Sequence, residues 1–187
     1  MSTRGSVIGL TMRINGILNA RYLPWLAGSD GRWQLEAFGK CPLDELMLQR
    51  LKRFPMLLVD CHFDDATWWD QRLGEQTVPV ACSDERIELG RDVLTALWCL
   101  LDDGPEFHCL TGIAPAVSAL WDRAGFNQIV GAGRCWCAEF QPRWGDVPTF
   151  WHRLLCDSNG DSEWDLAQLQ ALQLCGRHRT AGTDISQ

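Results

Sequence analysis

The sequence predicts a mainly α fold: a single compact helical domain with at most a small two- or three-stranded β element. Two observations carry this prediction. Apolar residues recur at spacings of three and four along several segments, as on one face of a helix. Segments that alternate like strands are few, short and flanked by glycine or proline. The chain has 187 residues, 46% of them hydrophobic, which is enough for one core.

The expected boundaries follow from where apolar residues are scarce. Residues 1–16 are polar and interrupted by glycine, and residues 176–187 have almost no apolar content. We therefore expect a loose N-terminal segment over 1–16, one globular domain over 17–175 and a disordered tail over 176–187.

Individual helices are predicted from periodicity together with start and stop signals. Ser83 is a good N-cap, and the apolar stripe behind it ends near Leu101, before Asp102-Asp103-Gly104-Pro105. Proline at the first turn and a glycine at the end mark a second helix over 115–124. The same reasoning predicts three more helices, over 42–54, from Pro148 to about Leu155, and from about Ser162 to Gly176.

Three short segments have the pattern of strands or fit both a strand and a helix. Val78–Cys82 and Cys135–Phe140 alternate like strands and could form a small hairpin. Met56–Val59 is a short apolar run that fits either a buried strand or part of the next helix, and we favour the helix.

Composition excludes several classes of protein. A formal charge of −7 and a pI near 5.0 argue against binding nucleic acid through a broad basic surface. Nine cysteines, an odd number spread through apolar segments, do not suit a fully paired disulfide framework and favour a reducing compartment. Met1–Leu10 lacks the apolar core of a secretory signal, and no apolar run of 18 residues occurs. We therefore expect a cytoplasmic protein.

Asp60–Asp65 (Asp-Cys-His-Phe-Asp-Asp) is the densest set of reactive side-chain types. A thiolate beside an imidazole and carboxylates could serve a nucleophilic enzyme, but such groups normally come from distant parts of a fold. We favour a buried cysteine with an aspartate that caps a helix. Zinc would need a second ligand pair, which is not evident, and the Cys135-x-Cys137 spacing better suits core packing. We predict no catalytic residue, metal or cofactor.

Asp157–Asp161 places oxygen ligands at the first, third and fifth positions of a calcium loop. The rest of the loop departs from that pattern, because Ser162 stands where glycine should turn the chain and Gln168 where glutamate should close the site. We favour a polar turn that leads into a capped helix.

Ten tryptophans against one tyrosine suggest packing and partner surfaces. Exposed tryptophans are frequent hot spots in protein interfaces. Four of them lie near polar or loop segments and are our partner-binding candidates: Trp68, Trp69, Trp144 and Trp151. The alternative is that these side chains pack into the core beneath loops.

Three stretches, in chain order, resemble the cytoplasmic sorting-platform adaptor family of bacterial type III secretion systems. They are Ala20–Leu23, Leu51–Leu58 with Cys61-His62, and Glu85–Gly90 continuing through Leu101 and Pro115. The first lacks the family's histidine and preceding Phe-x-Pro. The resemblance implies a non-enzymatic adaptor that links the sorting platform to the membrane ring. It would bind other protein subunits of the secretion assembly and associate with the membrane complex only peripherally.

A second resemblance implies a different class. Arg86–Arg91 with the following helix, and Ala119–Phe126, are similar to the C-terminal half of a GNAT-like N-acyltransferase that uses an acyl-CoA donor. In that family, backbone amides at a helix N-terminus hold the CoA pyrophosphate. Here Glu88 would repel phosphate and Trp121 replaces the usual tyrosine, so we favour the adaptor.

Overall fold

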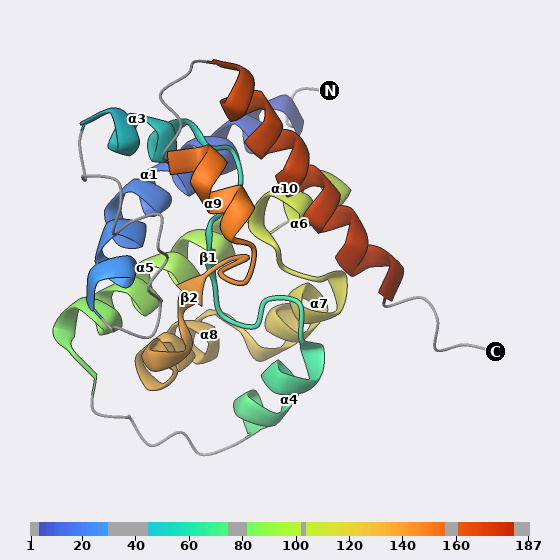
Figure 1. Cartoon of the computed structure of the whole chain (residues 1–187). Helices are drawn as coiled ribbons and strands as arrows, with labels where there is room; N and C mark the ends of the chain where they lie inside the picture. The colour runs from blue at the N-terminus through green and yellow to red at the C-terminus, as the bar shows by residue number, and fades with distance from the viewer. Residues whose placement is uncertain (1–3, 30–44, 75–81, 102–103, 156–160, 182–187) are drawn as a thin grey trace.

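The computed structural model describes residues 4–29, 45–74, 82–101, 104–155 and 161–181 (Figure 1). The predicted mainly helical fold is confirmed. Within these ranges there are nine α-helices, one 3-10 helix and one two-stranded antiparallel sheet. The helices are α1 (Arg4–Ser29), α3 (Glu45–Arg53), α4 (Ala66–Gly74), α5 (Asp84–Cys99), α6 (Pro105–Thr111), α7 (Pro115–Ala124), α8 (Phe126–Cys135), η1 (Cys137–Glu139), α9 (Pro148–Leu155) and α10 (Asp161–Ala181).

The sheet lies near the centre of the view in Figure 1, with helices around it. Strands β1 (Val59–Asp60) and β2 (Gln141–Pro142) pair with Val59 opposite Pro142 and Asp60 opposite Gln141. Within the described residues, no helix is long and apolar enough to cross a bilayer.

Helices with strong local signals form where the sequence predicts them. Ser83 caps α5, because its hydroxyl oxygen accepts a hydrogen bond from the Arg86 amide at 3.4 Å. Helix α7 has the predicted bounds, and Gly125 ends it in the left-handed φ region, at 85°. The predicted helices over 42–54, after Pro148 and after Ser162 correspond to α3, α9 and α10. Residues 42–44 lie outside the described part.

Both predicted ends of the domain differ from the structure. Residues 1–16 were expected to be loose, but α1 begins at Arg4 and the side chains of Thr11 and Asn15 are buried. These two polar residues lie inside the protein, so the expectation of a loose segment was wrong for residues 4–16. Helix α10 continues through Gly176 to Ala181, so the expected tail over 176–187 is helical for half its length. Residues 182–187 lie outside the described part.

Two of the predicted local structures also change. Met56–Val59 is extended and runs into β1 instead of forming a helix. Cys135–Phe140 is not a strand: it contains the end of α8 and then η1, where the Trp136 amide donates to Ala132 O and the Glu139 amide to Trp136 O. Of the predicted strand Val78–Cys82, residues 78–81 lie outside the described part.

Two buried asparagines on α1 explain why Met56–Val59 is extended. The Asn19 amide donates to Met56 O at 2.7 Å, and its oxygen accepts from the Leu58 amide at 2.7 Å. One turn earlier, the Asn15 amide donates to Pro55 O at 2.9 Å and to Leu110 O at 3.3 Å. Both side chains are fully buried. They provide backbone partners that an extended, buried segment would otherwise lack.

Helices α5 and α8 cross at a pair of glycines. A Cβ atom added to Gly133 would lie 2.9 Å from the carbonyl carbon and oxygen of Gly90. Only glycine at both positions allows the backbones to approach this closely. Gly90, in the interior of α5, therefore serves a close helix crossing.

Replacing Asn19 with leucine should destabilise the fold. The change leaves Met56 O and Leu58 N buried without their partner, at a cost of about 2–4 kcal/mol in the free energy of unfolding. Urea denaturation followed by circular dichroism would measure it. As a control, Asn127→Leu alters an asparagine exposed on α8 and should change stability by less than about 0.5 kcal/mol. Equal effects of the two substitutions would contradict this role of Asn19.

Two glycine substitutions on α8 test the close crossing of α5 and α8. Gly133→Ala should lower the free energy of unfolding by about 1–3 kcal/mol, because the new methyl group meets the backbone of α5. A Cβ at Gly131 meets nothing within 4 Å, so Gly131→Ala should raise stability through helix propensity by up to about 1 kcal/mol. Thermal unfolding of both variants checks the opposite signs. A stable Gly133→Ala protein would show that the crossing is looser than described.

Candidate functional site

Helices α4 and α8 lie close to each other in the lower part of Figure 1. Aromatic and charged side chains that are partly exposed contact one another in this part of the protein. We call this group the Trp68 cluster. Its members come from three places: the turn after β1, helix α4, and the junction between α8 and η1. They are His62, Trp68, Arg72, Trp136 and Glu139.

Trp68 is at the centre of the cluster. Its ring stacks on the imidazole of His62, with centroids 4.6 Å apart and planes inclined by 19°. Trp136 meets it edge to face at 6.0 Å. The Arg72 guanidinium lies 4.4 Å from the centre of the Trp136 ring and 5.6 Å from that of Trp68. These are cation–π and aromatic geometries that fix the orientation of both indoles.

The backbone at His62 is strained. Its φ is 52°, in the left-handed region that residues other than glycine rarely adopt. Two donors hold its carbonyl: the Trp69 indole N–H at 3.0 Å and the Asp65 amide at 3.0 Å. The imidazole Nε2 lies 3.6 Å from Glu139 Oε2, and these two side chains are 34% and 45% exposed. This conformation presents the ring toward Trp68 at the surface, and such strain often accompanies a functional site.

Asp65 sets the start of α4. Its carboxylate accepts a hydrogen bond from the Trp68 amide at 2.9 Å, which is an N-terminal cap. Cys61 is fully buried, and burial, with the nearby charges of Asp60 and Glu139, raises the pKa of its thiol well above the ordinary value. The preferred interpretation of Asp60–Asp65, a buried cysteine with a capping aspartate, is confirmed. A protonated, inaccessible thiol is a poor nucleophile.

The other predicted chemical motifs have different outcomes. Among the described residues, no group of three or more His, Cys, Asp and Glu side chains could hold a metal ion. Of the calcium-loop candidate Asp157–Asp161, residues 157–160 lie outside the described part. Cys135 is a buried free thiol, whereas Cys137 forms a disulfide with Cys82 that the sequence did not predict.

Three of the four predicted partner-binding tryptophans lie in the core. Trp69 and Trp151 are fully buried and Trp144 nearly so, whereas Trp68 is partly exposed. Trp69 packs against Trp121 with centroids 4.9 Å apart, and the Trp151 indole donates to Trp144 O at 2.9 Å. Burial matches the alternative of packing beneath loops for these three. Partner binding by Trp68 stays a prediction.

Sequence reasoning missed three members of the cluster as candidate site residues: Arg72, Trp136 and Glu139. Arg72 could have been found, because it follows Trp68 by four residues and so lies on the same face of α4. Trp136 and Glu139 come from a distant segment. No local signal connects that segment to α4.

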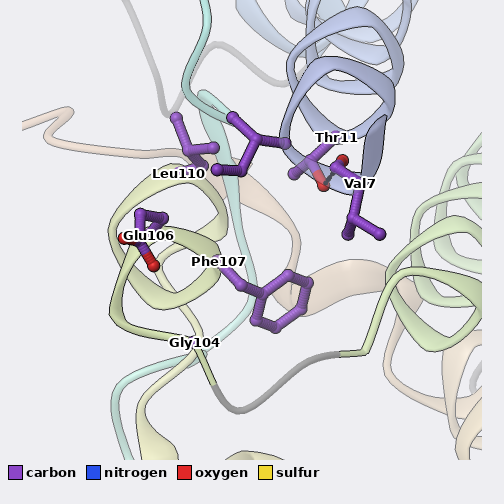
Figure 2. Close-up of a pocket in the computed structure, with 7 residues that line it drawn as sticks. Val7, Thr11, Gly104, Glu106, Phe107 and Leu110 are labelled. Carbon is purple, nitrogen blue, oxygen red and sulfur yellow. Dashed lines mark hydrogen bonds between the residues drawn. The ribbon is translucent and has the colours of Figure 1, made fainter. Parts of the chain in front are cut away.

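A small hollow lies between α1 and α6. Figure 2 shows Glu106, Phe107 and Leu110 of α6 opposite Val7 and Thr11 of α1. Its cavity volume is about 20 Å³, which is room for one water molecule. Sites for organic ligands are on the order of 300–1,000 Å³, so this hollow is not a metabolite site.

The acyltransferase alternative needs free amides near Arg86 and a larger sheet. Instead, the amides of Arg86 and Ile87 both bond to Ser83 O at 3.1 Å, and the sheet in the described residues has two strands. A pyrophosphate would have to displace this helix cap. The structure therefore provides no acyl-CoA groove of that kind in the part that it describes.

Comparisons with protein-family models, curated proteins and solved structures found nothing that matches this chain. The fold and the Trp68 cluster therefore define the class of protein on their own. It is a helical protein with an ordered, partly exposed tryptophan–arginine–histidine surface.

Alanine substitutions of the two neighbouring tryptophans of α4 should distinguish a core residue from a surface residue. Trp69→Ala removes a fully buried indole and should cost about 3–5 kcal/mol of stability. Trp68→Ala should cost about 1–2 kcal/mol, because its ring is only partly buried. Chemical denaturation of both variants provides the comparison. Equal losses would mean that Trp68 is a core residue and not a surface residue.

Proposed function

We propose that this chain is a non-enzymatic adaptor that binds another protein through the Trp68 cluster. The observation that carries the proposal is the ordered stack of His62, Trp68, Trp136 and Arg72 at the surface. Tryptophan and arginine are the residue types most enriched at interface hot spots. Because the rings are already fixed in the free protein, binding loses little side-chain entropy there.

The charge of the cluster suggests what faces it. Arg72 covers the two indoles, and Glu139 lies beside His62 at the edge. A partner surface with an apolar centre and polar groups of both signs at its edge would complement this arrangement. The whole chain is acidic, with a formal charge of −7, which favours partners that are neutral or basic overall.

The assembly that we propose for this adaptor comes from the resemblance to the type III secretion adaptors. In that assembly, a cytoplasmic sorting platform is joined to a membrane ring. One structural feature supports it. The three stretches that carry the resemblance meet in space. Asn19, beside the first, bonds to Met56 and Leu58 of the second, and Tyr22 of the first donates to Asp92 next to the third at 2.7 Å.

Capture of tagged full-length protein from its own cells, with mass spectrometry of what is retained, tests the proposal. We expect platform or inner-ring proteins of a type III secretion apparatus. Trp68→Ala should reduce their recovery about 30-fold or more, because removal of a tryptophan hot spot costs about 2 kcal/mol or more in binding. Arg72→Ala should act in the same direction.

Trp98→Ala is the matched control. Trp98 is also partly buried and packs against Phe126 at 6.2 Å, away from the cluster. It should leave capture unchanged. Equal capture by wild type and by a folded Trp68→Ala protein would remove the cluster from the proposal. Cluster-dependent capture of proteins from a different assembly would retain the adaptor and reject the secretion platform.

A further inference from the structure

A disulfide is attached to the chain segment that carries two members of the Trp68 cluster. It joins Cys82, the residue before the cap of α5, to Cys137, the first residue of η1. Trp136 precedes Cys137, and Glu139 follows it by two positions. Both are members of the cluster. The covalent link is therefore made to the same short segment that supplies one side of the proposed binding surface.

The segment around η1 has a second anchor. The buried guanidinium of Arg86 donates to the carbonyls of Cys137 at 3.2 Å and Ala138 at 3.1 Å. Arg86 lies one turn into α5, and Cys82 lies just before that helix begins. Both anchors thus fasten η1 to the start of α5, one by a covalent bond and the other by charge-assisted hydrogen bonds.

The two cysteines of the disulfide differ in exposure. Cys137 is fully buried, whereas Cys82 is partly exposed, so Cys82 is the side on which we expect an external thiolate to attack. Cys82 also lies beside the N-terminus of α5, where the helix dipole favours a thiolate when that sulfur is released. Helix α5 itself ends in a free thiol, the exposed Cys99, at the opposite end of the helix from Cys82.

We propose that the Cys82–Cys137 disulfide is a redox switch of the Trp68 cluster. A dithiol reductant attacks Cys82 through its thiolate, the disulfide bond breaks, and Cys137 leaves as a thiolate that takes a proton. The second thiol of the reductant then attacks the mixed disulfide and releases Cys82. The protein gains two electrons and two protons, and the reductant becomes a disulfide.

After reduction, η1 is held to α5 by Arg86 and by packing alone. Trp136 and Glu139 lose part of the support that keeps them against Trp68 and His62. The oxidised protein therefore has the ordered surface and the reduced protein a looser one. The consequence for partner binding rests on the proposed function, whereas the change in η1 does not.

Hydrogen exchange of the full-length protein measures the change directly. The protein is equilibrated with glutathione disulfide or with dithiothreitol, and alkylation followed by mass spectrometry reports whether Cys82 and Cys137 are linked. The Trp136 and Glu139 amides, bonded to Ala132 O and Trp136 O, should exchange about tenfold faster or more after reduction. The Leu58 amide, bonded to Asn19, should not change.

Two variants make the result specific. Cys82→Ser, at the more exposed sulfur, should exchange like the reduced protein even without reductant. Cys99→Ser should retain the wild-type response. The switch is overturned if Cys82 and Cys137 stay unlinked in glutathione disulfide, or if exchange at η1 is the same in both redox states.

Partner capture in the two redox states extends the test. Capture should be lost on reduction and in Cys82→Ser, and retained in Cys99→Ser. If Trp68→Ala does not alter capture, the proposed function fails while the exchange result still decides the switch. If Trp68→Ala abolishes capture but reduction affects neither exchange nor capture, only the switch fails.

Discussion

Two asparagine side chains on α1 fix the path of the chain at the centre of this protein. Asn15 and Asn19 bond to the backbone from Pro55 to Leu58, which has no helix to satisfy it. Other elements provide further hydrogen bonds to the same segment: Leu57 N donates to Leu110 O at 2.7 Å, and Arg143 N donates to Leu58 O at 2.7 Å. Elements distant in sequence thus meet on one extended segment. Asn19 uses both its amide and its oxygen in this network, so another path of the segment would leave buried polar groups unmet at a high cost.

The proposed binding surface depends on that arrangement. The extended segment continues into β1, whose pairing with β2 fixes the turn that carries His62. That turn ends at Asp65, which caps α4 and so sets the direction in which Trp68 and Arg72 project. On the other side, Arg86 and the disulfide hold the segment that carries Trp136 and Glu139. The cluster is therefore assembled from two supports, one built on hydrogen bonds to α1 and the other on the start of α5.

The sequence predicted those features whose causes are local. Ser83 and Pro115 start helices through their own backbone and side-chain chemistry, and Gly125 ends one, so α5 and α7 were predicted closely. Met56–Val59 was assigned to a helix because the partner that keeps it extended, Asn19, is 37 residues from Met56. The polarity of residues 1–16 resembles that of a solvated chain end. Asn15, however, is buried and donates hydrogen bonds to backbone carbonyls of other segments. The two neighbouring tryptophans of α4 differ in burial for the same reason. Trp69 packs against Trp121, and Trp68 packs against His62. Only the packing of elements distant in sequence distinguishes the two positions.

The central claim is that the Trp68 cluster faces another protein in the cell. Photo-crosslinking tests it most directly, with a photoreactive phenylalanine analogue placed at position 71, where Gln71 is exposed beside Arg72 on α4, or at position 126, where Phe126 is exposed outside the cluster. We predict a discrete protein adduct from position 71 that is absent from position 126. It should also disappear when Trp68 is replaced by alanine in the same chain. No adduct from position 71, or the same adducts from both positions, would contradict the assignment of this surface.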